Sequence, residues 1–201
     1  MSQCSLIYSY KQEINSPSDL VAIMNTGNQL YSCLSGQAYF MQTELPTMLS
    51  VFDSDYQLHY SESYTGTVHQ ETAIEGYQYC ISLQTAFESL ISQGYTNFML
   101  TAGCISVAIY EGDVGFKIFD SHARDLYGRV RPQSTCVLLD VLSIERLVKY
   151  FQSVHINDIF EVKGVKTDQV QNSIIPNTAF VTKANQSGAV AICYICRSAS
   201  P

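Results

Sequence analysis

The sequence predicts an α+β fold in which N-terminal helices pack on a central, mostly antiparallel sheet. Helical patterns dominate residues 1–40, and strand patterns separated by turn signals dominate residues 97–141. Further helical patterns lie before and after those strands. Because consecutive strands joined by short turns pair in antiparallel fashion, we expect an antiparallel or mixed sheet.

The first strong helix signal begins at Ser16. Its hydroxyl suits a helix cap, Pro17 suits the first helical position, and Asp19 places a negative charge in the first turn. We expect this helix to break near Gly27, because glycine is typical of helix C-termini. A second helical stretch is expected from Leu30.

The middle of the chain alternates between strand, loop and helix patterns. We expect a short turn or helix over 46–51 and a strand over 56–60, where large apolar and polar side chains alternate. Residues 61–78 are polar and rich in tyrosine, which predicts a long loop. Apolar residues at helical spacing over 83–91, followed by Gly94, predict a helix and its C-terminal glycine.

Strand patterns then dominate. Residues 98–100, 105–110 and 116–122 predict three strands, and the turn at 111–115 makes the last two a hairpin. The remaining elements are expected in this order: a basic connection over 123–134, a strand over 135–141, a helix over 144–151 and a last strand over 160–165.

Composition favours one globular domain with a C-terminal addition. The chain has 201 residues, of which 46% are hydrophobic and 14% charged, as in a protein with a substantial core. We assign residues 1–165 to the domain. Residues 166–201 are rich in Gln, Asn and Ser, and we assign them to a linker or the start of a further region.

Charge and targeting patterns restrict the partners. The net charge is −7 and no cluster of Lys and Arg marks a phosphate-binding surface, so we expect no nucleic-acid partner. No run reaches the roughly 20 apolar residues of a membrane span, and the N-terminus lacks a secretory signal pattern. We therefore expect no membrane partner and an intracellular protein, cytoplasmic or nuclear.

The seven cysteines are odd in number and scattered, which suits reduced thiols. Cys193 and Cys196 have the spacing of a zinc-binding pair, but no second pair follows them. The sequence therefore indicates neither a metal site nor a cofactor.

Asp120 and His122 stand two positions apart at the end of the predicted strand 116–122. On a strand, such residues project from the same face. A carboxylate beside an imidazole holds the ring in one tautomer and stabilises its charged form, which is the arrangement of a catalytic base. By itself the motif also fits an aspartate that caps a turn beside an incidental surface histidine.

The flanking sequence resembles the tegument-like cysteine peptidases, the family of herpesvirus large-tegument deubiquitinases and their cellular relatives. The resemblance runs from about residue 4 to residue 165 and is most specific over 116–140. In that region the family has a strand ending in Asp-x-His, a polar loop with a glycine, and a return strand. Residues 18–31 also resemble the family's second helical element.

This resemblance implies a papain-like fold and a cysteine nucleophile that cleaves ubiquitin, or a ubiquitin-like modifier, after its C-terminal diglycine. It implies that His122 is the general base and that Asp120 orients it. The family pattern Gly-x-Gln-Cys places the nucleophile at a helix N-terminus, with a nearby glutamine that binds the oxyanion. Gln3 and Cys4 are the matching residues in this chain.

Two alignments of the N-terminus remain open. If Gln3 and Cys4 are the family's Gln-Cys pair, Cys4 is the nucleophile, and the helix that it opens is short. If residues 2–8 instead match later turns of that helix, the nucleophile lies upstream and Cys4 is a buried apolar residue. Residues 4–8 have the pattern of a helix interior, which favours the second alignment.

Three functional hypotheses follow. The first is a cysteine-type deubiquitinase that uses Cys4, His122 and Asp120, and the second is a catalytically incomplete relative that binds ubiquitin. The third is an unrelated α+β domain with a chance Asp-x-His. The oligomeric state is left open by the sequence.

Overall fold

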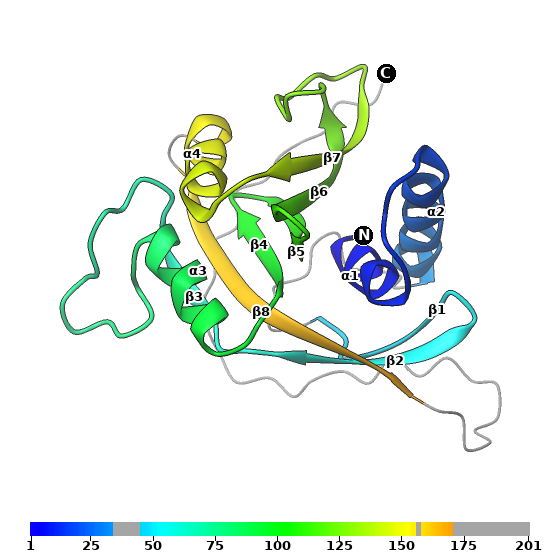
Figure 1. Ribbon diagram of the computed structural model, residues 1–201, viewed down its shortest axis with the longest axis horizontal. Helices are drawn as coiled ribbons and strands as arrows, with labels where there is room; N and C mark the ends of the chain where they lie inside the picture. Colours follow the sequence, from blue (N-terminus) through cyan, green and yellow to red (C-terminus); the bar gives the residue numbers. More distant parts are fainter. Residues whose placement is uncertain (34–44, 156–157, 171–201) are drawn as a thin grey trace.

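The computed structural model describes residues 1–33, 45–155 and 158–170. Within those residues the chain forms four helices and an eight-stranded sheet (Figure 1). The helices are α1 (Ser2–Lys11), α2 (Pro17–Cys33), α3 (Leu83–Ser92) and α4 (Ile144–Val154). The strands are β1 (Met48–Val51), β2 (Ser54–Tyr60), β3 (Tyr64–Thr67), β4 (Asn97–Ala102), β5 (Ile105–Gly112), β6 (Gly115–Arg124), β7 (Thr135–Val141) and β8 (Ile159–Val170).

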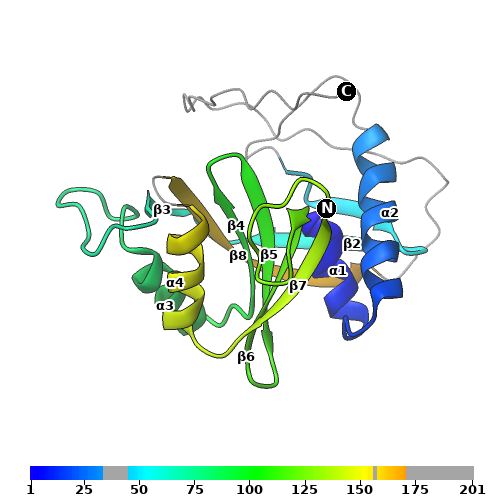
Figure 2. The same ribbon diagram turned by 90° about the horizontal axis from the view of Figure 1, so that it is seen from above.

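The sheet has the order β1-β2-β8-β4-β5-β6-β7, and β3 also pairs with β8. The ladders between neighbouring strands are antiparallel, which confirms the expected sheet type. The last strand, β8, inserts between β2 and β4 and so joins the first hairpin to the later strands. Figures 1 and 2 show α1 and α2 on one side of this sheet and α3 and α4 on the other.

Alternating side chains build two cores on opposite faces of the sheet. In β4, Phe98 packs with α3 and α4, whereas its neighbour Met99 packs with α1 and α2. In β6, Ile118 lies in the core with α3 and α4, and Phe119 lies in the core with α1 and α2. Burial of each such phenylalanine stabilises the fold by about 1.5–3 kcal/mol. Because successive side chains of a strand point to opposite faces, Ile118 and Phe119 show to which face of the sheet the following residue of β6 points.

Several elements lie where the sequence placed them. Ser82 caps α3 by accepting a hydrogen bond from the Thr85 amide, and Gly94 after this helix has a φ of 79°. Ser143 caps α4 in the same way. The β5–β6 hairpin and strand β7 are also confirmed. The last strand is longer than expected, because β8 continues to Val170 in its pairing with β2.

The expected break near Gly27 is wrong, because α2 runs without interruption to Cys33. Gly27 serves a different purpose there. A Cβ at this position would stand 2.7 Å from Cγ of Met1, so the missing side chain allows the N-terminus to pack closely against α2. Glycine in a helix interior thus reflects close packing here rather than an end.

The expected turn or helix over 46–51 is also wrong, because residues 48–51 form β1 and pair with β2. Phe52 and Asp53 make the connecting turn with φ values of 51° and 60°. Part of the expected loop 61–78 is likewise a strand, since β3 pairs with β8. None of the helices in the described part of the chain has the length and hydropathy needed to cross a membrane.

Candidate active site

Asp120 lies near the end of β6, where the pairing with β7 becomes irregular between Asp120 and Arg124. Phe119 faces the core beneath α1 and α2, so strand alternation directs Asp120 to the face that carries α3 and α4. Its side chain is buried, with 1% of its surface exposed. The fold therefore holds this carboxylate inside the protein, at the point where the strand gives way to a loop.

His122 is hydrogen-bonded to Asp120 in two ways. Nδ1 of the ring lies 2.7 Å from Oδ1 of Asp120, and the backbone amide of His122 donates to the same oxygen over 2.9 Å. Because Oδ1 accepts, the contact favours the tautomer with a proton on Nδ1 and leaves Nε2 for proton transfer. The His122 side chain is 44% exposed, so the ring is accessible while the carboxylate is not.

The second oxygen of Asp120 belongs to Arg124. Nε of Arg124 donates to Oδ2 over 2.7 Å, and this guanidinium is as buried as the carboxylate. Burial by itself would raise the pKa of Asp120. The hydrogen bonds from His122 and the positive charge of Arg124 outweigh burial and lower that pKa below its usual value. Asp120 is therefore an anion at neutral pH.

Tyr150 of α4 supports the loop that follows the strand. Its hydroxyl donates to the carbonyl of Gly128 over 3.2 Å. Burial, followed by the negative charge of Asp120, raises the pKa of Tyr150 to about 12. In the same loop, Oδ1 of Asp125 accepts hydrogen bonds from the amides of Tyr127 and Arg129, each over 2.9 Å. The connection beside His122 is thus held by defined contacts.

Cys4 lies in the first turn of α1, where its side chain is completely buried. It packs in the core that contains Phe119, on the face of β6 opposite to Asp120. Burial, partly offset by the positive N-terminal amine, raises the pKa of the Cys4 thiol. Among the residues that the structure describes, no hydrogen bond joins Cys4 to His122.

The side-chain amide of Gln3 donates two hydrogen bonds. Nε2 donates to the carbonyl of Pro46 over 3.0 Å and to the hydroxyl of Tyr60 over 2.6 Å. An oxyanion contact from Gln3 would require one of these bonds to break.

The N-terminus of α1 nevertheless lies at the same end of the sheet as His122. Ser2 donates from Oγ to the carbonyl of Ser106 over 3.0 Å. The β5–β6 pairing ends at Ala108 and Phe119, so Ser106 and Asp120 both lie just beyond the same end of this ladder. The fold thus brings Gln3, Cys4, Asp120 and His122 to one end of the sheet, with Cys4 on the other face from Asp120.

Two of the three remaining histidines have acidic partners. His59 lies 3.2 Å from Asp168 on the surface, and the buried His155 lies 2.8 Å from Asp158. In residues 1–33, 45–155 and 158–170, no group of three or more His, Cys, Asp and Glu side chains is placed to hold a metal ion. The zinc-like spacing of Cys193 and Cys196 lies outside the described residues.

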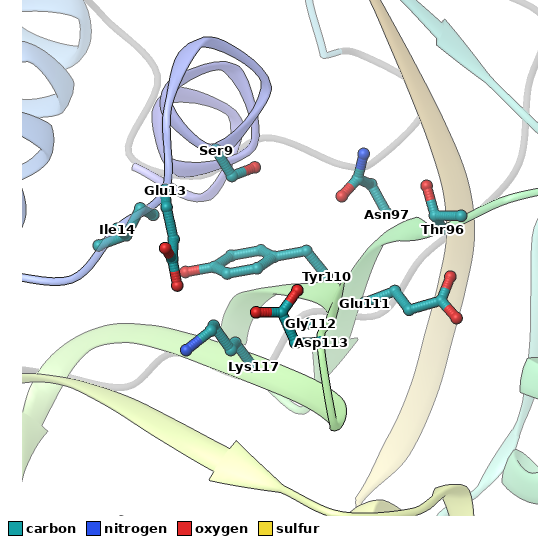
Figure 3. Close-up of a pocket in the computed structure, with 10 residues that line it drawn as sticks. All are labelled: Ser9, Glu13, Ile14, Thr96, Asn97, Tyr110, Glu111, Gly112, Asp113 and Lys117. Carbon is teal, nitrogen blue, oxygen red and sulfur yellow. The ribbon is translucent and has the colours of Figure 1, made fainter.

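An open pocket of about 480 Å³ lies at the opposite end of β5 and β6 (Figure 3). Its walls combine Glu13 after α1, Tyr110 and Glu111 of β5, Asp113 in the hairpin turn, and Lys117 of β6. Neither Cys4 nor His122 lines it. The pocket is therefore separate from the candidate active site.

Sequence reasoning did not identify Arg124 or Tyr150 as parts of this site. For Arg124 a signal existed, because residues 120, 122 and 124 are two positions apart on one strand, and such residues project from the same face. Tyr150 lies 30 positions away from Asp120 in the sequence, on a helix whose docking the local pattern does not reveal. Its role depends on tertiary packing alone.

Comparisons with known proteins agree with this architecture. The model of the family described as "herpesvirus tegument protein, N-terminal conserved region" matches residues 1–171. Among solved structures, the chain is similar to the ubiquitin-specific protease encoded by murine cytomegalovirus tegument protein M48, in complex with a ubiquitin-based suicide substrate. The TM-score is 0.65 at 17% identity, over 87% of this chain and 78% of that chain. A search of curated proteins found no match. The likeness confirms the expected peptidase-like fold.

Proposed function

The chain belongs to the herpesvirus tegument protein N-terminal family, and on that premise we propose that it is a cysteine-type peptidase. Its proposed reaction is cleavage of ubiquitin, or of a ubiquitin-like modifier, after the C-terminal diglycine. The observation that carries the proposal is the hydrogen bond of 2.7 Å between Nδ1 of His122 and the buried Asp120. This contact fixes the ring of a half-exposed histidine with Nε2 available, as a general base requires.

In the proposed reaction, Nε2 of His122 takes the proton of the attacking thiol and Asp120 stabilises the resulting imidazolium. The thiolate bonds to the carbonyl carbon of the terminal glycine. Collapse of this adduct breaks the bond to the amine, which leaves with the proton from His122. Water then hydrolyses the thioester by the same route and regenerates the thiol.

We assign the nucleophile to Cys4, which lies in the first turn of α1. The unpaired backbone N–H groups of a helix N-terminus favour a nearby thiolate, which opposes the rise in the Cys4 pKa that burial causes. Attack requires the sulfur to come within roughly 3 to 4 Å of the imidazole. Since Cys4 is fully buried and lies across β6 from Asp120, the first turn of α1 must shift for this approach.

Ubiquitin as the partner is supported by the similarity to the M48 protease, whose structure holds a ubiquitin-based suicide substrate. A local surface supports a protein partner as well. Leu126, Tyr127 and Val130 in the loop after His122 are 88%, 76% and 70% exposed. Exposed apolar side chains on a loop fixed by hydrogen bonds are typical of a protein-binding surface.

A ubiquitin probe with a thiol-reactive C-terminal group tests the proposal. We expect it to label the wild-type chain and the Cys136→Ser control, whose cysteine is partly exposed on β7. It should not label Cys4→Ser, and His122→Ala should react much more slowly. Labelling that persists in Cys4→Ser would assign the nucleophile to another residue, and absence of labelling in the folded wild type would refute the peptidase.

A second function, ubiquitin binding without hydrolysis, is favoured by the complete burial of Cys4 and by the committed amide of Gln3. In that case NMR spectra of labelled protein should show saturable shifts on titration with ubiquitin, while the probe gives no adduct. Absence of shifts up to millimolar ubiquitin would remove this function.

A further inference from the structure

Arg124 is the largest side chain that the fold buries completely among the described residues. Only 1% of its surface is exposed, although Arg is seldom buried unless it is paired. Its Nε donates to Oδ2 of Asp120 over 2.7 Å. The two terminal nitrogens, Nη1 and Nη2, are buried without a hydrogen-bond partner in the described part of the chain.

Such a guanidinium contributes little to stability. Desolvation of the charge is costly, and two of its three nitrogens recover no hydrogen bond. Buried ion pairs of this kind are often replaced by apolar residues without loss of stability. The polar interaction that the Arg124 side chain does form is thus its hydrogen bond to Asp120.

We infer that Arg124 is a positioning residue for the His122–Asp120 pair. Arg124 occupies Oδ2, so the carboxylate cannot rotate and Oδ1 stays directed at Nδ1 of His122. Its positive charge also keeps the buried carboxylate ionised. Arg124 therefore sets the tautomer of His122 through Asp120, from a position that is buried from solvent.

The other groups near the carboxylate do not perform this task. Tyr150 on α4 is neutral below its pKa of about 12, so it brings no positive charge. Asp125 in the following loop is negative and binds backbone amides. The positive charge of Arg124 lowers the pKa of Asp120, as does the interaction with His122.

The test compares Arg124→Gln, which removes the charge, with Arg124→Lys, which retains it. In the wild type, ¹⁵N NMR of histidine-labelled protein should show His122 protonated on Nδ1, in the tautomer uncommon for free histidine. In Arg124→Gln we expect a mixture of tautomers, and the ¹³C titration midpoint of Asp120 should rise by on the order of one pH unit. Arg124→Lys should restore the Asp120 midpoint and only part of the tautomer preference.

A merely structural role would lower the melting temperature and leave both NMR signals unchanged in the folded variants, and that result would overturn the inference. If neither variant folds, Arg124 is a structural residue and the inference is wrong.

The kinetic consequence rests on the proposed function. Arg124→Gln should react with the ubiquitin probe about tenfold or more slowly, a part of the 10²- to 10⁴-fold that a general base supplies. Arg124→Lys should recover part of that rate. If the wild type is not labelled at all, the proposed function fails, while the NMR signals of His122 and Asp120 still decide the role of Arg124.

Discussion

Tyr8 of α1 donates a hydrogen bond of 2.7 Å to Asp19 in the first turn of α2. Asp19 also accepts from the Ser16 hydroxyl and from the backbone amides of Asn15 and Ser16. One carboxylate thus caps α2 and ties the two helices of this face together. Hydrogen bonds from Ser16, then Tyr8, then Asn15 lower the pKa of Asp19 to about 2.

This depressed pKa predicts an acid-dependent loss of stability. An unfolded aspartate titrates near 3.9, so the contribution of Asp19 is complete above about pH 4 and disappears as the pH falls toward about 2. The melting temperature of the wild type should fall over this window. In Asp19→Asn the fall should be smaller and the melting temperature at pH 7 lower. Equal slopes in the two proteins, measured by circular dichroism, would contradict the assignment.

A second prediction concerns Gly164 in the long central strand β8. The ring of Tyr95 lies over this glycine so closely that an added Cβ would overlap the ring. Gly164→Ala should therefore cost about 1–3 kcal/mol in the free energy of unfolding. Gly112→Ala is the matched control, because its Cβ would stand 3.5 Å from the flexible Lys117 side chain. Denaturation with urea measures both; similar values would mean that the Tyr95 contact yields easily.

The sequence predicted the second half of this fold better than the first. From residue 83 to 154, the helical spacing of apolar residues, the glycine after the first of these helices and the strand patterns agree with the structure, because local chemistry determines these elements. The β1–β2 hairpin escaped prediction since its turn uses Phe52 and Asp53 at positive φ, without the Asn-Gly signal of such turns. β3 depends on a partner strand almost 100 residues away.

The candidate site divides in the same way. Alternation along β6 was enough to predict that Asp120 and His122 point together, and their hydrogen bond confirms this placement. The burial of Arg124 was not predictable, because a charged residue in a basic, Gly- and Pro-containing segment usually faces solvent. Likewise, the sequence alone does not show on which side of the sheet Cys4 lies. The packing of α1 on β5 and β6 determines this.

Thiol reactivity provides a third prediction, which does not depend on ubiquitin. Cys4 is fully buried and its pKa is raised by burial, whereas Cys80, Cys104 and Cys136 are partly exposed. In the native protein, iodoacetamide should modify Cys4 last of these four cysteines, and the rate of Cys4 modification should keep rising to a higher pH than for an ordinary thiol. Peptide mass spectrometry measures each site. Rapid modification of Cys4 at neutral pH would instead indicate that α1 opens readily and exposes a reactive thiolate.

The apolar loop next to His122 supports a fourth prediction, which rests on the proposed partner. Leu126→Asp and Tyr127→Asp should each weaken ubiquitin binding about tenfold or more while leaving the melting temperature unchanged, because both side chains lie in solvent. Val114→Asp is the control, since Val114 is 72% exposed in the hairpin turn at the other end of β6. Equal affinities for the three variants in calorimetric titrations would place ubiquitin elsewhere.

The fifth prediction uses a double-mutant cycle on the buried ion pair of Asp120 and Arg124. Asp120→Asn should destabilise the protein by about 3–5 kcal/mol, because it leaves the buried guanidinium without a counter-charge. Arg124→Met alone should be milder, since His122 continues to bind the carboxylate. In the double variant no unpaired buried charge remains, and we expect it to regain most of the stability that Asp120→Asn loses. Strictly additive effects in urea denaturation would mean that the two side chains do not interact in solution. A large recovery would show that the pair is dispensable for folding, so that its retention in the fold is better explained by the orientation of His122.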